Sequence, residues 1–506
     1  MGEIKRAGKI PRFALEAAAK ARLRRIGVID VGSNSVRLVV FDGMARSPAY
    51  FYNEKVLAGL GAGLAETGRL SPEGRVRAMA ALRRFAALAE RMKLSGMIAV
   101  ATAAVREARD GPAFCAEVQA ETGLMLHVAS GGEEARLAAQ GVLLGWPAAE
   151  GLICDMGGAS MELAHVEKGE IGACATSPLG PLKLADLRDP ADVEKAIRKG
   201  VKALRKAVPG RAPRLFLVGG SWRAIARLDM ERIGYPLHVL HGYAPPAPQL
   251  LETLGWIGGQ DLGRLAAATG VSAARIALLP LAAQVLAELL RRIEPGRVTI
   301  SGYGLREGLL YRQMPEDMRA RDPLIEAARH MERAQARAPG FGDALFDWLA
   351  PLYGESGPEE RRLVHAACLL HDVNWRAHPD YRAALSFEAA LHASFAGVNH
   401  AERAYLGLAL LNRYKGASDG LGRFAPLLDA ARAAEAVSLG KALRLGAMIS
   451  GSALGVLEHC PLERGPGRLT LALRGPARAF AGEAVERRLA ALAARLGVEA
   501  ELRVGD

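Results

Sequence analysis

The chain has 506 residues, of which 50% are hydrophobic and 24% charged, a composition typical of a folded globular protein large enough for several domains. No apolar run reaches the roughly 18 residues of a membrane helix, so a membrane is excluded as a partner. The net charge of +12 suits a polyanion, but nucleic acid is not expected, because recognition motifs and basic stripes interleaved with aromatics are missing.

The first 24 residues are rich in lysine and arginine and are interpreted as a solvated basic arm. They hold no apolar core of a secretion signal. The five cysteines are scattered and form no CxxC pair, which indicates a reducing compartment and argues against a zinc ribbon. We therefore expect a cytoplasmic protein.

The first predicted strands, 26–30 and 36–41, flank a turn whose sequence occurs again later in the chain. IDVGSNSVRLVV (29–40) and CDMGGASMELAH (154–165) share Asp, Gly, Ser and Leu at matching positions. Glycine permits a tight turn that presents backbone N–H groups to an anion, and an Asp at the strand end can share a divalent cation with a phosphate. The repeat therefore predicts two similar lobes whose turns clamp a phosphoryl group.

Between the two turns, a helix is predicted over 71–92 and strands over 97–101 and 124–129. ATAAVREA (101–108) follows a strand, and Arg106 is either a phosphate ligand reaching the cleft or an ordinary surface arginine. SGGEEARL (130–137) opens a helix with Glu133 and Glu134. These glutamates either interact with the helix dipole or include a base that deprotonates a water molecule.

Beyond the second turn, with its strands at 151–155 and 160–166, strands over 214–219 and 297–301 each lead into a helix. VGGSWRAI (218–225) places a glycine pair and Trp222 after the first, where they can border a pocket. ISGYGLREGLLY (300–311) places Ser301 and Gly302 after the second, either as another anion site or as ordinary loop-to-helix capping. After about residue 314 helices dominate, until a β–α–β pattern at 468–504.

Taken in order, DVGSNS (30–35), EEAR (133–136), DMGGASME (155–162) and SGYGLREG (301–308) resemble motifs of the exopolyphosphatase and guanosine pentaphosphate phosphohydrolase family, in the actin-like ATPase-fold superfamily. The resemblance implies an α/β fold of two actin-like (ribonuclease H-like) lobes with a facing active-site cleft, over 25–138 and 139–314. An all-α HD-like domain (315–444) and a small C-terminal α+β module (445–506) would follow.

In that family the second glutamate of EEA is the catalytic base, which corresponds to Glu134 here. The resemblance also implies that Asp30, Asp155 and Glu162 bind Mg²⁺, and that Asp30, Asp155 and Arg106 take part in catalysis. The expected phosphate-binding residues are Gly32, Ser33, Asn34, Ser35, Gly157, Gly158, Ala159, Ser160, Ser301 and Gly302. Ala159 departs from the family, which usually has a third glycine there, and its methyl group is tolerable only if φ is negative.

LVHAACLLHDV (363–373) preserves the His371–Asp372 dyad of HD phosphohydrolases, but His365 lies six positions away and so on another helix face. We therefore expect this dyad to be a structural remnant that helps to bind polyphosphate or to form a homodimer, not a metal site.

The implied activity is exopolyphosphatase, which releases orthophosphate from the end of inorganic polyphosphate with Mg²⁺ and a Glu base. Alternatives are guanosine pentaphosphate 5′-phosphohydrolase, a kinase of the same fold, and a non-catalytic sensor of polyphosphate or guanosine tetraphosphate.

Overall fold

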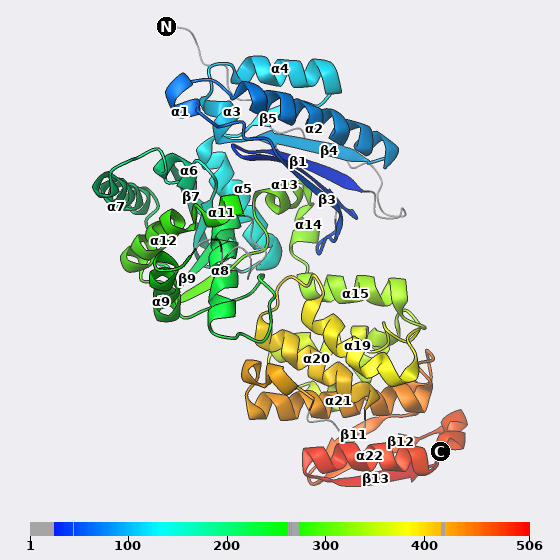
Figure 1. Ribbon diagram of the computed structural model, residues 1–506. Helices are drawn as coiled ribbons and strands as arrows, with labels where there is room; N and C mark the ends of the chain where they lie inside the picture. Colours follow the sequence, from blue (N-terminus) through cyan, green and yellow to red (C-terminus); the bar gives the residue numbers. More distant parts are fainter. Residues whose placement is uncertain are drawn as a thin grey trace. The chain divides into compact units, whose positions relative to one another are not determined.

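The structure is a computed structural model that describes residues 25–505 except 44, 262, 264, 266–272 and 416–419. It divides into two compact units, Met1–Arg321 and Asp322–Asp506 (Figure 1). The expected basic arm, residues 1–24, lies outside the described residues. Within the described ranges, no helix combines the length and apolar character needed to cross a membrane.

The first unit begins with a sheet of five strands in the order β3-β2-β1-β4-β5. β1 pairs antiparallel with β2 and parallel with β4, and β2 pairs antiparallel with β3. The strands are β1 (Ile26–Val31), β2 (Ser35–Phe41), β3 (Tyr50–Leu57), β4 (Gly96–Ala101) and β5 (Leu126–Val128). This sheet forms the core of lobe I.

Lobe II repeats the same topology in the order β10-β9-β6-β7-β8. Here β6 takes the place of β1, because it pairs antiparallel with β7 and parallel with β9. The strands are β6 (Gly151–Met156), β7 (Met161–Glu167), β8 (Glu170–Ser177), β9 (Arg214–Gly219) and β10 (Arg297–Ile300). The repeated sequence phrase therefore reflects a repeated fold, and the predicted pair of α/β lobes is confirmed.

Helices cover both sheets. In lobe I, α2 (Pro72–Arg91) starts with Ser71 as N-cap, whose hydroxyl accepts from the Gly74 N–H at 3.1 Å, and packs its apolar face on the sheet. The other helices of lobe I are α1 (Leu64–Thr67), α3 (Ala103–Glu107) and α4 (Gly111–Thr122). Lobe II carries α6 (Pro181–Leu184), α7 (Pro190–Ala207), α8 (Gly220–Arg232), α9 (Ala247–Gly258), α11 (Ala273–Ile276) and α12 (Leu279–Ile293), and its connection to the second unit includes α14 (Glu316–Arg319).

Two helices, α5 (Gly131–Gly145) and α13 (Leu305–Gln313), pack closely against each other. A Cβ at Gly308 would lie 1.8 Å from the carbonyl oxygen of Leu137, and one at Gly141 would lie 2.1 Å from that of Gly304, so only glycine permits this approach. The expected lobe boundary at 138/139 is wrong. It falls inside α5, whose apolar side packs on β6, β7 and β9 of lobe II.

The second unit starts at Asp322, seven residues after the expected boundary, where the Asp322 carboxylate caps α15 by accepting from the Leu324 and Ile325 N–H groups. Its helices are α15 (Pro323–Gln335), α16 (Phe341–Trp348), α17 (Ala350–Tyr353), α18 (Pro358–Leu370), α19 (Pro379–His392), α20 (His400–Tyr414), α21 (Ala430–Ser450) and α22 (Glu483–Leu496). A small sheet joins β11 (Leu462–Gly465), β12 (Arg468–Leu473) and β13 (Glu499–Val504) in that order. The expected boundary at 444/445 is also wrong, because α21 runs through it without a break.

Candidate active site

The two repeated turns have the same internal hydrogen bond. The Gly32 N–H donates to the Ser35 carbonyl at 2.9 Å, and the Gly157 N–H donates to the Ser160 carbonyl at 3.0 Å. The turns meet across a cleft, since a Cβ at Gly158 would lie 4.0 Å from the Cβ of Ser33. The two repeated turns therefore face each other, as the sequence predicted, and anion binding by them stays a prediction.

A cavity of about 250 Å³ lies between the turns. The expected site residues that line it are Asp30, Gly32, Ser33, Asn34, Ser35, Glu134, Asp155, Gly157, Gly158, Ala159, Ser160 and Glu162. Thr102 and Gly304 also line it, as do residues of the glycine-pair segment after β9. The cavity thus brings together residues from both lobes and from the crossing helices α5 and α13.

Four carboxyl groups converge on this cavity. Burial raises the pKa of Asp30, and burial together with the neighbouring Asp30 raises that of Asp155 to about 6. The pKa of Glu162 is raised well above its usual range by burial and by Glu134 and Asp155, although Thr176 donates a hydrogen bond to it at 2.9 Å. Clustered carboxylates whose ionisation is disfavoured are well suited to a divalent cation.

Glu134 occupies the first turn of α5 and is 7% exposed. Burial raises the pKa of its carboxyl group to about 7, against the opposing effect of Arg106, which forms an ion pair with it. The neighbouring Glu133 lies outside the cavity lining, where it pairs with His127 at 2.8 Å and with Arg312 at 2.9 Å. The structure therefore distinguishes the two glutamates that the sequence left as alternatives.

Arg106 does not line the cavity. Its guanidinium donates to the Ala129 carbonyl at 2.7 Å and contacts the Glu134 carboxylate. In this structure the Arg106 side chain is engaged by Ala129 and Glu134, and its expected role as a direct phosphate ligand stays a prediction.

Two other expected phosphate ligands are also absent from the cavity lining. Ser301 is fully buried, and its hydroxyl donates to the Tyr303 carbonyl at 2.7 Å within its own loop. Gly302 borders a neighbouring cavity, and its N–H donates to His241 Nδ1 at 3.1 Å. Trp222 belongs to the apolar core of lobe II and does not shape the cleft.

Ala159 fits the turn without backbone strain. Within the described ranges, the non-glycine residues with positive φ are Lys93, Lys168, Glu294 and Ser452. Since Ala159 is not one of them, its methyl group is accommodated at an ordinary backbone conformation.

Most of the cationic residues at the site were not predicted from the sequence. Lys55, Arg223, Arg275 and Arg306 line the cleft, and the last three also border an adjacent cavity of about 380 Å³ together with Arg37 and Arg227. Burial and mutual repulsion lower the pKa of Lys55 and of Arg223, and bring that of Arg37 to about 10. This concentration of positive charge beside the carboxylates favours the binding of a polyanion. The Arg in SGYGLREG and in VGGSWR was the available signal for two of these residues.

Asp30, Asp155 and Glu162 line the cavity, and their carboxylates carry oxygen atoms of the kind that Mg²⁺ prefers. Among the residues that the structure describes, no group of three or more His, Cys, Asp or Glu side chains is placed to hold a metal by itself. The expected set of three ligands, Asp30, Asp155 and Glu162, is therefore not grouped as a metal site in this structure, and Mg²⁺ stays a prediction.

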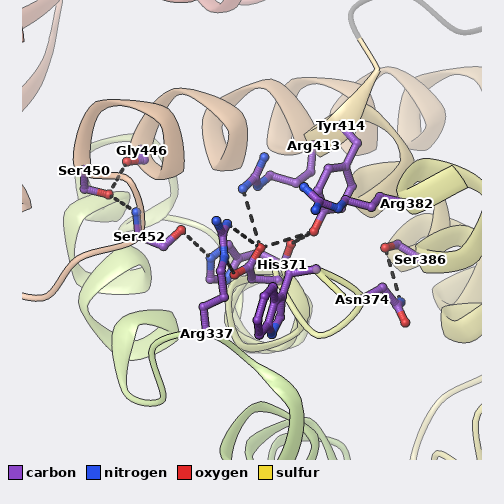
Figure 2. A network of polar contacts seen from close by, with 12 residues as sticks. Arg337, His371, Asn374, Arg382, Ser386, Arg413, Tyr414, Gly446, Ser450 and Ser452 are labelled. Atoms are coloured by element: carbon purple, nitrogen blue, oxygen red, sulfur yellow. Dashed lines mark hydrogen bonds and ion pairs between the residues drawn. The ribbon is translucent and has the colours of Figure 1, made fainter. Parts of the chain in front are cut away.

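In the second unit, the His371–Asp372 dyad is occupied by protein contacts (Figure 2). Arg337 forms a bidentate pair with Asp372 at 2.6 and 2.9 Å, and His371 Nδ1 lies 2.7 Å from the Cys368 carbonyl oxygen. Burial lowers the pKa of His371 to about 4. Both side chains are thus engaged by protein groups, and the expectation that the dyad is not a metal site stays a prediction.

Comparison with known proteins identifies the family. The model of the Ppx/GppA phosphatase family matches residues 39–317, more than half of the chain. The chain belongs to this family of phosphatases. A second model, "Exopolyphosphatase, C-terminal", matches residues 324–503 in the second unit.

Among the relatives of this Ppx/GppA phosphatase, Exopolyphosphatase 2 of Mycobacterium tuberculosis is 26% identical over 317 residues, covering 57% of this chain and 98% of that protein. Guanosine-5'-triphosphate,3'-diphosphate pyrophosphatase of Aeromonas salmonicida is 26% identical over 358 residues, covering 68% of this chain and 72% of that protein. The crystal structure of an exopolyphosphatase from Cytophaga hutchinsonii superposes with a TM-score of 0.53 at 25% identity, over 57% of this chain and 97% of that one.

Proposed function

We propose that the protein is a Mg²⁺-dependent exopolyphosphatase that removes terminal phosphates from inorganic polyphosphate. The observation that carries the proposal is the position of Glu134, whose buried carboxyl group lines the cavity between the two Gly/Ser turns. Burial raises the pKa of this group to about 7. A general base works best when its pKa lies near the working pH. The family match and the names of the mycobacterial relatives, which are exopolyphosphatases, support the same class of reaction.

The terminal phosphoryl group would lie between the turns. Because the N–H groups of Gly32 and Gly157 already close the turns, we assign the phosphate contacts to the following residues, Ser33, Asn34, Gly158 and Ala159, which line the cavity. Such donors stabilise the charge on the equatorial oxygens of the loose transition state.

Glu134 would accept a proton from the attacking water, and Arg106 would hold the carboxylate in the required orientation. Asp30 and Asp155, which line the cavity, would hold Mg²⁺ together with water and substrate oxygens, and the bound ion would neutralise charge on the phosphate oxygens. Lys55 and Arg306 would neutralise the phosphate groups that follow along the chain. Arg306 is placed for this by its pairing with Asp30, 3.9 Å away.

The second candidate is hydrolysis of the 5′-γ-phosphate of guanosine pentaphosphate. The adjacent cavity of about 380 Å³ favours it, because Tyr50 and Asn53 border this cavity along with its arginines and offer contacts to a nucleoside. The Aeromonas relative, a guanosine-5'-triphosphate,3'-diphosphate pyrophosphatase, points to the same substrate class. The two substrates would use one set of catalytic groups.

Phosphate release from long-chain polyphosphate, measured with Mg²⁺ and with a chelator, tests the proposal. We expect release only with Mg²⁺, and a kcat/KM for polyphosphate above that for guanosine pentaphosphate. The reverse order would establish the second candidate, and binding of either compound without turnover would establish a sensor.

A further inference from the structure

Glu307 carries a buried carboxyl group beside the cleft that the proposed mechanism leaves without a role. It lies in the first turn of α13 and is 1% exposed. It is not among the described residues that line the catalytic cavity or the adjacent one, whereas the preceding residue, Arg306, lines both. Burying a carboxyl group is costly unless its oxygens are hydrogen-bonded. The partners of Glu307 therefore indicate what it does.

The two oxygens of Glu307 accept hydrogen bonds from two separate segments. Oε2 accepts from the Gly304 N–H at 2.8 Å, which fixes the residue that precedes α13. Oε1 accepts from the Tyr50 hydroxyl at 2.9 Å. Tyr50 lies on β3, the edge strand of lobe I, and its ring packs on Phe41 with the ring centroids 5.5 Å apart. Two hydrogen bonds in series therefore link lobe I to the turn that leads into α13.

The turn that Glu307 holds presents Arg306 to the cleft. Gly304 and Arg306 both line the catalytic cavity. The other end of the turn is held by Arg223, whose guanidinium donates to the Gly302 carbonyl at 3.1 Å. The backbone that carries Arg306 is thus fixed on both sides.

The charge of Arg306 depends on the same carboxylate. Although burial opposes the effect, the carboxylates of Glu307 and Asp30 raise the pKa of Arg306. By contrast, burial lowers the pKa of the neighbouring Arg223. Glu307 therefore both holds the backbone that carries Arg306 and stabilises its guanidinium group.

We propose that Glu307 is a positioning residue, which holds the turn from Gly304 to Arg306 so that Arg306 meets the phosphate groups of the substrate, and that Tyr50 in turn holds Glu307. This role rests on the proposed function, which assigns Arg306 to the polyanion. Fixing an arginine before the substrate arrives reduces the conformational entropy that is lost on binding. The effect is therefore expected in the affinity for substrate and not in the chemical step.

Two substitutions of Glu307 separate its hydrogen bonds from its charge. Glu307→Gln removes the charge, but its amide oxygen can still accept from the Gly304 N–H and its NH₂ group can donate to the Tyr50 oxygen. Glu307→Ala removes the same charge and both hydrogen bonds. Electrostatics alone would strengthen the binding of a polyanion equally in the two variants, because each removes one negative charge.

We expect the KM for polyphosphate to rise about fivefold or more in Glu307→Ala, as for the loss of a hydrogen bond at a charged site, with kcat near that of the wild type. The KM of Glu307→Gln should be at or below that of the wild type. Equal KM values in the two variants, or a loss confined to thermal stability, overturn the proposal.

Two further variants test whether the effect passes from Tyr50 through Glu307 to Arg306. Tyr50→Phe keeps the ring and every charge and removes only the hydroxyl, so it stays informative if Glu307→Ala does not fold. Its KM should rise, by less than that of Glu307→Ala. In the background of Arg306→Gln, Glu307→Ala should cause no further rise in KM, because the group that it positions is gone. An unchanged KM in Tyr50→Phe, or an additive loss in the double variant, overturns the proposal.

Binding without turnover separates this role from the proposed function. The affinity for a short polyphosphate, measured by equilibrium dialysis without Mg²⁺, should be lower in Glu307→Ala than in the wild type and retained in Glu307→Gln. That order of affinities in a protein that shows no turnover supports the positioning role and overturns the proposed function. Normal turnover by the wild type with equal affinities in all three proteins overturns the positioning role and leaves the proposed function intact.

Discussion

Substitution of Glu134 by glutamine is the sharpest test of the proposed mechanism. Glutamine keeps the shape of the side chain and can still accept a hydrogen bond from Arg106, but it cannot take a proton. Loss of a general base typically costs about 10²–10⁴ in rate, so kcat should fall by that factor while the affinity for polyphosphate is retained.

The pKa of Glu134 sets a second expectation. With a pKa of about 7, roughly nine-tenths of the carboxyl groups are ionised at pH 8 and a tenth at pH 6. A base acts only when ionised, so wild-type kcat should fall as pH is lowered through this range. Mg²⁺ bound beside Asp30 and Asp155 favours the ionised form, which places this limb at pH 7 or below. The residual rate of Glu134→Gln should lack it.

Glu133 provides a matched control one position away. Glu133→Gln breaks the contacts to His127 and Arg312, at a cost of about 1 kcal/mol in unfolding free energy, but touches nothing in the cavity. Its kcat should be that of the wild type. The assay is initial phosphate release at saturating polyphosphate, with thermal unfolding of each variant in parallel. Retention of more than about a tenth of kcat by Glu134→Gln, or equal damage by both variants, would refute the assignment.

Asp155→Asn should raise the Mg²⁺ concentration for half-maximal activity and lower kcat, because one of two facing carboxylates is lost; an unchanged Mg²⁺ titration argues against this ligand. Gly308→Ala should lower the free energy of unfolding by about 1–3 kcal/mol, because the new Cβ would lie 1.8 Å from the Leu137 carbonyl oxygen. Gly132→Ala, where a Cβ would meet open space, should be neutral or stabilising. Calorimetry of both variants tests this difference. Burial lowers the pKa of His371 to about 4 in the folded protein, from its usual 6.5, so the folded state favours the neutral ring. The free energy of unfolding that this ring contributes is therefore fully present above pH 6.5 and is lost as the pH falls toward 4. Hydrogen exchange in α18 should accelerate over that range, and His371→Gln should remove the part due to this ring.

The sequence predicted the repeated core of the fold well, because its signal is local. A buried strand, a Gly/Ser turn and a second strand recur around Asp30 and Asp155, and the structure gives both copies the same register and the same strand order. The edge strands β3 and β8 were missed. Both are exposed along much of their length, so the apolar alternation that reveals a half-buried strand is weak in them.

The candidate site was predictable only where its residues lie in contiguous motifs. Asp30 and Asp155 lie near the ends of β1 and β6, and Glu134 lies in the first turn of α5, so their shared location follows from the topology. Lys55 and Arg275 reach the same cavity from an edge strand and a short helix, and no local pattern distinguishes them from surface cations. Arg106 was assigned to phosphate from its residue type, its place after a strand and the family resemblance, whereas its contact with Glu134 depends on how α3 meets α5.

The duplicated scaffold has become chemically unequal in its two halves. Asp30 lies opposite Arg37 in the β1–β2 register, whereas Asp155 lies opposite Glu162 in the β6–β7 register. Lobe I therefore presents a guanidinium where lobe II presents a second carboxylate. Phosphoryl transfer requires both, since the metal needs oxygen ligands and the polyanion needs compensating positive charge. A symmetric pair of turns could clamp a phosphate, but under the proposed mechanism the difference at this one position gives lobe II the carboxylates for the metal and lobe I positive charge for the polymer.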